Sequence, residues 1–321
     1  MLTKNVKKGI KISAIVAAII YITLQIGIAF YQMPDQTMEN TIKKGEWIAI
    51  NKIAVGDYFL GFKLPSLSKI ERGDLVYMFD PTDVDNPLYN RKKMISRVVA
   101  LPKDAFELTN RALYVNNELV KEQPTIKQGY RVVVNDGVSL DSAFFGKYGL
   151  TEFIREDTKS ELADKYKDIY KFEYSPVEIW EVPMTAEKAL EVEKDSLLSY
   201  VRMIRARVPG RYFRTWPYSS YWFWNRWSTS PTFEVPGKGT VVSINFRTLA
   251  GYEELIEKYE GNKLDATLDN AIYINGSRVN SYTVKENYYI VLSDNRDRYF
   301  DLRSFGLVPE SMIIGKVINK N

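Results

Sequence analysis

Two short segments of the chain concentrate side chains that could do chemistry. Residues 33–42 carry Asp35, Thr37 and Glu39, and residues 293–306 are rich in aspartate, arginine and serine. The chain contains no histidine and no cysteine. Serine–histidine–aspartate catalysis, cysteine–histidine catalysis and metal sites built on those ligands are therefore excluded. Any proton transfer must use lysine, tyrosine, carboxylates or water, and we expect no metal and no cofactor.

One hydrolytic chemistry open to such a chain is attack by a hydroxyl group with a lysine as the base. The lysine must be desolvated, because a lysine in water stays charged at neutral pH and cannot take the proton. Hydrogen-bond donors must also hold the oxyanion that forms on the attacked carbonyl. The question for this sequence is whether it supplies all three parts.

An N-terminal membrane anchor is expected to hold the chemistry-bearing segments outside the cytoplasm. No charged residue occurs from Ile12 to Pro34, and Ile10 to Gln32 would form a helix of roughly 34 Å, enough to cross a bilayer core. A cleaved signal peptide is the competing interpretation, but it would need a small-residue cleavage site. Four lysines precede the apolar stretch and predict a cytoplasmic N-terminus; they are Lys4, Lys7, Lys8 and Lys11.

The charge balance argues against a nucleic-acid partner. The chain has 44 lysine and arginine residues and 40 aspartate and glutamate residues, which gives a net charge of 44 − 40 = +4. The four N-terminal lysines account for that excess. The remainder of the chain is neutral overall, so it lacks the basic footprint of a nucleic-acid-binding protein. Membrane lipid is the expected partner of the anchor.

Beyond the anchor the sequence is typical of a mainly β fold. The predicted strands are short, rich in β-branched and aromatic residues and bounded by turn residues: 47–53, 75–79, 95–101, 132–134, 240–244 and 288–292. Asn116-Asn117 and Asn275-Gly276 predict two-residue hairpin turns. Helical patterns are expected at 157–169, 185–204 and 252–260, the last ending at Gly261.

We therefore divide the chain into an anchor, a β core in two halves, and an insertion. The anchor and cytoplasmic tail are residues 1–32, the β core is 33–124 with 236–321, and an α+β subdomain fills 125–235. Residues 212–227 of that subdomain hold nine aromatic side chains. They predict either the core of the insertion or a patch against the membrane interface or a protein partner.

Four segments, in order behind the anchor, resemble the conserved boxes of type I signal peptidases, which are serine–lysine peptidases. The first is Thr37–Ile42 with Lys44-Gly45-Glu46 and Asn51-Lys52, and the second is Arg72–Val76. The third is Ser96–Asp104, and the fourth is Ser293–Gly306, closed by Val308-Pro309 and Ile314–Lys316. The long insertion resembles the variety found in Bacteroidetes-type bacteria. The resemblance implies a signal-peptidase-like β core behind one transmembrane helix.

At the catalytic positions that this resemblance implies, the side chains differ from those of the family. Thr37 stands at the nucleophile position and Asp35 at the position of the side-chain oxyanion donor, where a carboxylate would repel the oxyanion. Ser96 stands at the general-base lysine position and Tyr299 at the position of the serine that orients that lysine. The frame is kept, and we assign folding and turn geometry to four of its residues, Asp294, Arg296, Asp301 and Arg303.

The other lysines near Ser96 are not expected to act as the missing general base. If residues 92–96 form a strand, Lys93 points to the face opposite Ser96, and Lys92 lies ~13 Å along the strand. Contact between a base and its proton donor needs roughly 2.6–3.2 Å. Lys103 replaces a family glycine in the following turn and is expected to be solvated.

The resulting hypothesis is an extracytoplasmic, catalytically inactive signal peptidase relative in the secretory pathway. It would bind peptides, assist an active paralogue, or scaffold a complex. Segments 33–41 and 94–99 would wall its cleft, with Met38, Ile95 and Arg97 as binding residues, and a secretory precursor peptide would add there as a strand. The alternatives are an active signal peptidase with an acid-polarised Thr37, and a sugar- or envelope-binding β domain.

Overall fold

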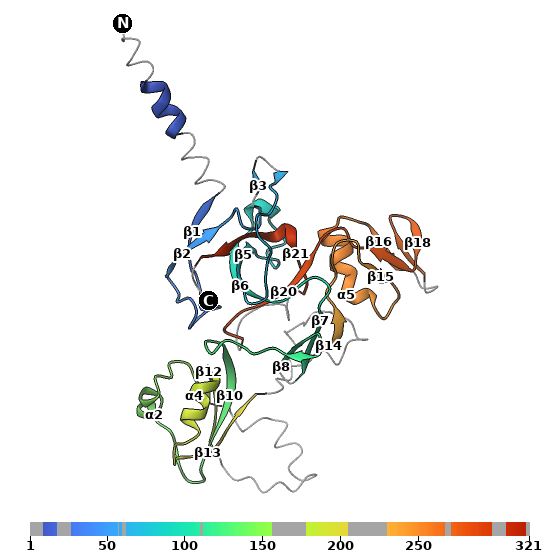
Figure 1. Ribbon diagram of the computed structural model, residues 1–321. Helices are drawn as coiled ribbons and strands as arrows, with labels where there is room; N and C mark the ends of the chain where they lie inside the picture. Colours follow the sequence, from blue (N-terminus) through green and yellow to red (C-terminus); the bar gives the residue numbers. More distant parts are fainter. Residues whose placement is uncertain are drawn as a thin grey trace.

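The fold is mainly β, as expected, and the computed structural model describes residues 9–17, 27–56, 58–59, 62–109, 112–155, 178–204, 230–266, 271–296 and 306–318. The strands outside the inserted subdomain form one curled sheet and several small ones (Figure 1). The helical predictions for 157–169 and the aromatic segment 212–227 lie outside the described residues.

The largest sheet has seven strands and carries the first core. Its spatial order is β1 (Ile28–Gln32), β2 (Trp47–Asn51), β22 (Ile313–Val317), β5 (Leu75–Phe79), β6 (Lys93–Ala100), β20 (Tyr288–Leu292) and β21 (Val308–Pro309). All neighbours are antiparallel. Every residue of β5 and β20 is buried, so these two strands are covered on both faces.

The sheet curls until its first strand meets its fifth. The hydroxyl of Tyr31 on β1 donates to the carbonyl of Lys93 on β6 at 2.6 Å, although three strands separate β1 from β6 in the sheet. The ring of Tyr31 also lies 4.9 Å from that of Tyr77 on β5. The right-handed twist of strands makes such curling the ordinary outcome of a large antiparallel sheet.

A second group of short strands carries its own core around Phe106 and Tyr288. It comprises β7 (Ala105–Thr109), β8 (Ala112–Val115), β9 (Glu118–Leu119), β14 (Ser230–Glu234), β15 (Val241–Ser243), β16 (Leu264–Ala266), β17 (Ile272–Ile274), β18 (Ser277–Val279) and β19 (Ser281–Thr283), with α5 (Leu249–Glu254) and a π-helical segment, η3 (Leu255–Tyr259). The smaller elements of the chain are β3 (Tyr58–Phe59), β4 (Phe62–Lys63), η1 (Leu88–Asn90) and η4 (Glu310–Met312).

Two turn predictions and one helix end are confirmed by backbone angles. Asn116 and Asn117 have φ of 54° and 66°, and Asn275 and Gly276 have φ of 52° and 81°. Two consecutive positive φ angles are what a type I′ hairpin requires. Gly261 follows η3 with φ of 67°, the left-handed conformation of a helix-ending glycine.

The described residues of the inserted subdomain form a four-stranded sheet, two helices and a separate core. Its sheet order is β11 (Ile154–Arg155), β12 (Ile179–Thr185), β10 (Lys127–Val134) and β13 (Leu198–Met203). The helices α2 (Ser142–Lys147) and α4 (Ala186–Val192) contribute Phe144, Phe145 and Ala189 to this core. Asp141 caps the N-terminus of α2 by accepting from the backbone of Ala143 and Phe144.

Three sequence predictions are wrong in detail. The helix expected over 185–204 ends at Val192, because Leu198–Met203 pairs with β10 as a strand. The insertion was expected to reach residue 235, but β14 pairs with β7 and so belongs to the β core. Ile28–Gln32, expected as the end of the membrane helix, is strand β1, since it pairs with β2 over its full length.

The N-terminal region supplies a helix at residues 9–17. Over the stretches that the structure describes, we find no helix with both the length and the apolar character needed to cross a bilayer.

Candidate functional site

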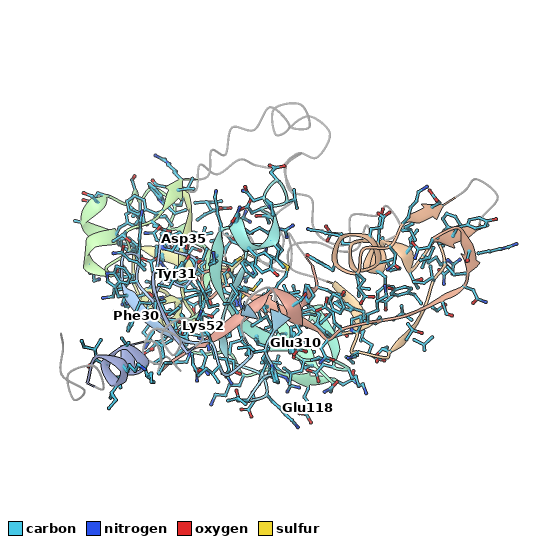
Figure 2. The ribbon with its side chains drawn as sticks, turned by 90° about the horizontal axis from the view of Figure 1, so that it is seen from above. Phe30, Tyr31, Asp35, Lys52, Glu118 and Glu310 are labelled. Atoms are coloured by element: carbon cyan, nitrogen blue, oxygen red, sulfur yellow. The ribbon has the colours of Figure 1, made fainter. Side chains whose placement is uncertain are left out.

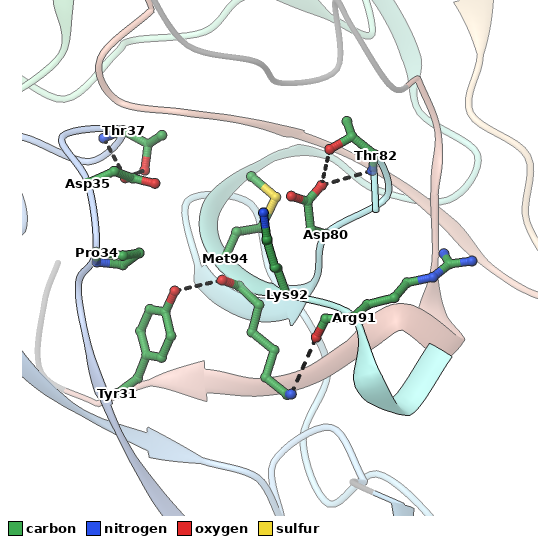
Figure 3. A pocket seen from close by; sticks show the side chains of 10 residues that line it. Tyr31, Pro34, Asp35, Thr37, Asp80, Thr82, Arg91, Lys92 and Met94 are labelled. Carbon is green, nitrogen blue, oxygen red and sulfur yellow. Dashed lines mark hydrogen bonds between the residues drawn. The ribbon is translucent and has the colours of Figure 1, made fainter. Parts of the chain in front are cut away.

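A cavity of about 630 Å³ opens where the curled sheet brings β1 close to β6 (Figure 3). The end of β1 and the chain that leaves it form one wall, and the loop after β5 and the start of β6 form the other. The lining residues are Tyr31, Pro34, Asp35, Thr37, Asp80, Thr82, Arg91, Lys92, Lys93 and Met94. Phe30, Tyr31 and Asp35 follow one another along the segment that runs from β1 into this wall (Figure 2).

Only part of this lining follows from the predicted cleft walls. Segment 33–41 contributes Pro34, Asp35 and Thr37, whereas segment 94–99 contributes only Met94. The wall at 80–93 was missed. One signal could have found it, because Asp80-Pro81-Thr82 repeats the spacing of Asp35-Gln36-Thr37.

Asp35 occupies both donors of Thr37. The backbone N–H of Thr37 donates to Asp35 Oδ1 at 2.9 Å, and its hydroxyl donates to the same oxygen at 2.6 Å. A nucleophile segment needs a base to take the proton of its hydroxyl and free N–H groups to stabilise an oxyanion. Here a carboxylate oxygen takes the N–H of Thr37, so this N–H is not available as an oxyanion donor, and the hydroxyl donates to a carboxylate rather than to a neutral lysine.

The same geometry recurs at a turn on the opposite wall. Thr82 donates to Asp80 Oδ1 from its backbone N–H at 2.8 Å and from its hydroxyl at 2.6 Å. Aspartate side chains commonly cap their own turns in this way. The Asp35–Thr37 contact therefore has the geometry of a local turn, and Figure 3 shows the two turns facing the same space.

Ser96, at the base position, is fully buried on β6 opposite Val76. Its hydroxyl has no hydrogen-bond partner within the described part of the chain. A serine hydroxyl cannot replace a neutral lysine as proton acceptor, and a buried hydroxyl left unpaired costs roughly 1–3 kcal/mol.

Two lysines line the cavity, although the strand geometry was expected to keep them away from Ser96. The ammonium of Lys93 lies 3.5 Å from the carbonyl oxygen of Arg91 and 5.5 Å from the centre of the Phe79 ring. Lys92 is solvent-exposed and points between Met94 and Asp80 (Figure 3). A lysine becomes a general base through desolvation, which the exposed Lys92 lacks.

The three predicted binding residues do not line the cavity, and this part of the prediction is corrected. Met38 and Ile95 are fully buried in the first core, and Arg97 is 4% exposed. Sequence spacing could not show that these side chains turn inward. Of the three, only Ile95 can contribute to the cavity, through its backbone N–H and C=O groups.

Arg97 instead forms a buried ion pair with Asp294. Its Nε and a terminal nitrogen donate to the two carboxylate oxygens at 2.8 and 2.7 Å, and its other terminal nitrogen donates to the carbonyl of Gly73 at 2.8 Å. The hydroxyl of Thr41 donates to the same carboxylate at 2.5 Å. Asp294 thereby ties the segment after Thr37 to β6.

Further polar contacts connect the inserted subdomain to this segment. The ammonium of Lys127, at the start of β10, lies 2.7 Å from the carboxylate of Glu39, and the hydroxyl of Thr41 bonds that of Thr125 at 2.9 Å. Arg296, 5% exposed, pairs with Glu122. Tyr299, Asp301 and Arg303 lie outside the described residues.

The pKa of Tyr31 reflects its burial and the negative charge in the cavity. Burial raises the pKa of its phenol, and the charges of Tyr77, Asp35 and Asp80 raise it further. Both carboxylates therefore act on the same wall of the cavity. Within the described residues, no three histidine, cysteine or acidic side chains are grouped so that they could hold a metal ion.

Comparison with known proteins places this geometry in a family. The family model described as signal peptidase, peptidase S26, matches residues 6–140 and 231–320. The unmatched stretch, 141–230, lies inside the predicted insertion. A protein of Pseudomonas aeruginosa called signal peptidase I is 35% identical over 96 residues, which are 29% of this chain and 32% of that protein. The chain thus matches about a third of that relative's length.

Proposed function

The chain belongs to the signal peptidase family, peptidase S26, and from this premise we propose that it binds extended peptides without cutting them. The observation that carries the proposal is the turn at Asp35, where one carboxylate oxygen accepts from both the hydroxyl and the N–H of Thr37. With Ser96 in place of a basic residue, the site lacks both a free backbone donor at Thr37 and a lysine base.

A peptide has an open strand edge to bind to. In an antiparallel pair, successive residues turn their backbone groups alternately to one neighbour and to the other. The carbonyl of Lys92 accepts from Asp80, and Val98 exchanges bonds with the chain at 73–74. The backbone groups of Lys92, Met94, Ser96 and Val98 therefore turn toward β5, and those of Lys93, Ile95 and Arg97 turn away from it.

On that other side the described part of the chain supplies only a partial neighbour. Strand β20 pairs with β6 only from Arg97 to Ala100, and the carbonyl of Lys93 is taken by Tyr31. The N–H and C=O of Ile95 consequently face the cavity side of the sheet. They are the groups to which an incoming extended peptide would add as a strand.

Strand addition at Ile95 predicts that one peptide amide matters most. We expect N-methylation of the amide that donates to the C=O of Ile95 to weaken binding by about tenfold, the cost of one lost hydrogen bond. Methylation of the neighbouring amides should have little effect. The measurement is fluorescence anisotropy with the full chain in detergent, using a set of peptides with identical side chains. Equal effects at all positions, or no binding, would contradict the proposal.

A second function, an active peptidase, is favoured by one contact. The hydroxyl of Thr37 donates to Asp35 at 2.6 Å, which is the acid-polarised hydroxyl that such an enzyme would need. This function ranks second because the same carboxylate oxygen also holds the Thr37 N–H. It also ranks second because Asp80 and Thr82 form the same turn.

We further propose that the protein is anchored in the cytoplasmic membrane with its main domain outside the cytoplasm. The apolar N-terminal sequence supports this, and so does an exposed apolar surface on the strands that follow it. Phe30 and Trp47 are 68% and 65% exposed and share one face of the β1–β2 pair. Aromatic side chains of this kind favour the membrane interface. Secretory precursors and an active signal peptidase paralogue are the partners this location suggests.

The proposed topology predicts labelling from outside the membrane. The chain has no cysteine, so a Lys263→Cys variant would carry a single thiol, at a side chain that is 78% exposed. We expect it to react with a membrane-impermeant maleimide in intact spheroplasts. A variant with cysteine at Lys4 should react only after lysis. Labelling of Lys263→Cys only after lysis would overturn the topology.

A further inference from the structure

We propose that the cavity selects peptides that carry a positively charged side chain, with Asp35 and Asp80 as the recognising pair and Lys92 as an internal competitor. This inference rests on the proposed function, because it specifies the peptide that the same site would bind. It adds Asp80 and Lys92, which the sequence analysis did not assign to the site.

Each carboxylate is held in place by one oxygen and offers the other. Asp35 and Asp80 both use Oδ1 to accept from a threonine two residues on. Across the described residues, neither Oδ2 has a hydrogen-bond or ion-pair partner. The turns thus fix the orientation of both acids and leave one acceptor atom of each available to a ligand.

The nearby cations do not neutralise this pair. The Nε of Arg91 donates to the carbonyl of Asn86 at 3.1 Å, and the ammonium of Lys93 is directed at the carbonyl of Arg91. Figure 3 shows the side chain of Arg91 extending away from Asp35 and Thr37. Lys92 alone points inward, so two negative charges face one positive charge.

A buried polar group on the same strand face adds a second observation. Met94 lines the cavity, and Ser96, two residues further along β6, lies on the same face of the strand. The Ser96 hydroxyl is fully buried and has no partner in the described part of the chain. Ser96 is not itself a lining residue of the cavity. It places an unsatisfied hydroxyl on the face of β6 that it shares with Met94, whereas the two carboxylates stand on the segments that follow β1 and β5.

Peptide binding itself makes the charge requirement stronger. A peptide laid along β6 would cover the cavity and displace water from Asp35 and Asp80. Removing water from a carboxylate is costly unless an opposite charge replaces it. A lysine or arginine side chain supplies that charge together with donors for the open oxygens. A neutral side chain does not, and an acidic one adds repulsion.

The test is a charge scan of a short, extended peptide. In a peptide of about ten small residues, lysine is placed at each position in turn and compared with norleucine at the same position. We expect one position at which lysine binds roughly tenfold more tightly than norleucine, as for one charge-assisted hydrogen bond. That preference should shrink as salt is added, because the exposed charges are then screened.

Three variants of the full chain distinguish the parts of the proposal. Asp80→Asn keeps the Oδ1 that caps Thr82 and should abolish the preference for lysine. Lys92→Gln should increase it severalfold by removing the competing cation. Asp85→Asn is the matched control, since Asp85 is exposed in the same loop and does not line the cavity; it should change nothing.

The outcomes separate this inference from the proposed function. Equal binding of lysine and norleucine peptides at every position would overturn the charge selection and leave strand addition standing. No binding of any peptide would overturn both. A weaker lysine preference in Lys92→Gln would show that Lys92 assists cation binding, and it would overturn its role as competitor.

Discussion

Replacing Asp294 by alanine is expected to lower the free energy of unfolding by about 3–5 kcal/mol. The Arg97 side chain is 5% exposed and would lose both of its carboxylate contacts. Of the contacts described above, the guanidinium of Arg97 would keep only its hydrogen bond to the carbonyl of Gly73. An unpaired charge in a buried position is among the few causes of so large a loss.

The measurement is chemical denaturation of the full chain in detergent, with Glu191→Ala as the control. Glu191 pairs with Lys188 on the surface of α4, and the two side chains are 54% and 35% exposed. Exposed pairs of this kind contribute roughly 0–1 kcal/mol. A loss below about 1 kcal/mol for Asp294→Ala would show that the ion pair does not hold the third and fourth boxes together.

The second large effect is a gain of proteolysis in a fourfold variant that combines Asp35→Ser, Thr37→Ser, Ser96→Lys and Tyr299→Ser. Removing Asp35 frees both donors of residue 37, and a lysine at position 96 would enter a fully buried position. Burial of that kind drives lysine toward its neutral, basic form. Catalytic groups act as a unit and are strongly non-additive.

We therefore expect cleavage of a secretory precursor only in the combined variant. Thr37→Ser alone should fail because the base is still missing. Ser96→Lys alone should fail because Asp35 would keep the new lysine charged. The combined variant should exceed wild type by roughly 100-fold or more, the usual contribution of a general base. The same combination with alanine at position 37 is the control. A folded fourfold variant without activity would mean that the cleft itself is lost.

Local sequence chemistry was sufficient for several elements of the fold. The strands at 75–79 and 288–292 were predicted with the bounds that the structure has, because their β-rich runs end at turn residues. The hairpin turns at 116–117 and 275–276 followed from the preference of asparagine and glycine for positive φ. In each case the information lies within about ten neighbouring residues.

The remaining features depend on contacts between distant parts of the chain. Nothing local in Ile28–Gln32 distinguishes the end of an apolar helix from a strand; pairing with β2 decides it. The wall at 80–93 joins the site because the sheet curls and Tyr31 reaches Lys93, 62 residues away. Arg97 was assigned to the cleft because the local sequence does not reveal its buried ion pair with Asp294, which lies 197 residues further along the chain.

For the site, the sequence identified which positions had changed but not what the changes do. Asp35 was expected to repel an oxyanion. The structure adds that Asp35 also binds the hydroxyl and the N–H of Thr37. Under the proposed function, the occupied N–H of Thr37 and the missing lysine base, rather than the loss of serine, account for the lack of hydrolysis at residue 37.

The central claim is tested most directly by incubating the purified wild-type chain in detergent with a secretory precursor and sequencing every product N-terminus by mass spectrometry. An active signal peptidase in a parallel reaction confirms that the precursor can be cut. We expect the precursor to stay intact with the wild-type chain, as it should with Thr37→Ala. A single new N-terminus that wild type produces and Thr37→Ala does not would contradict the account.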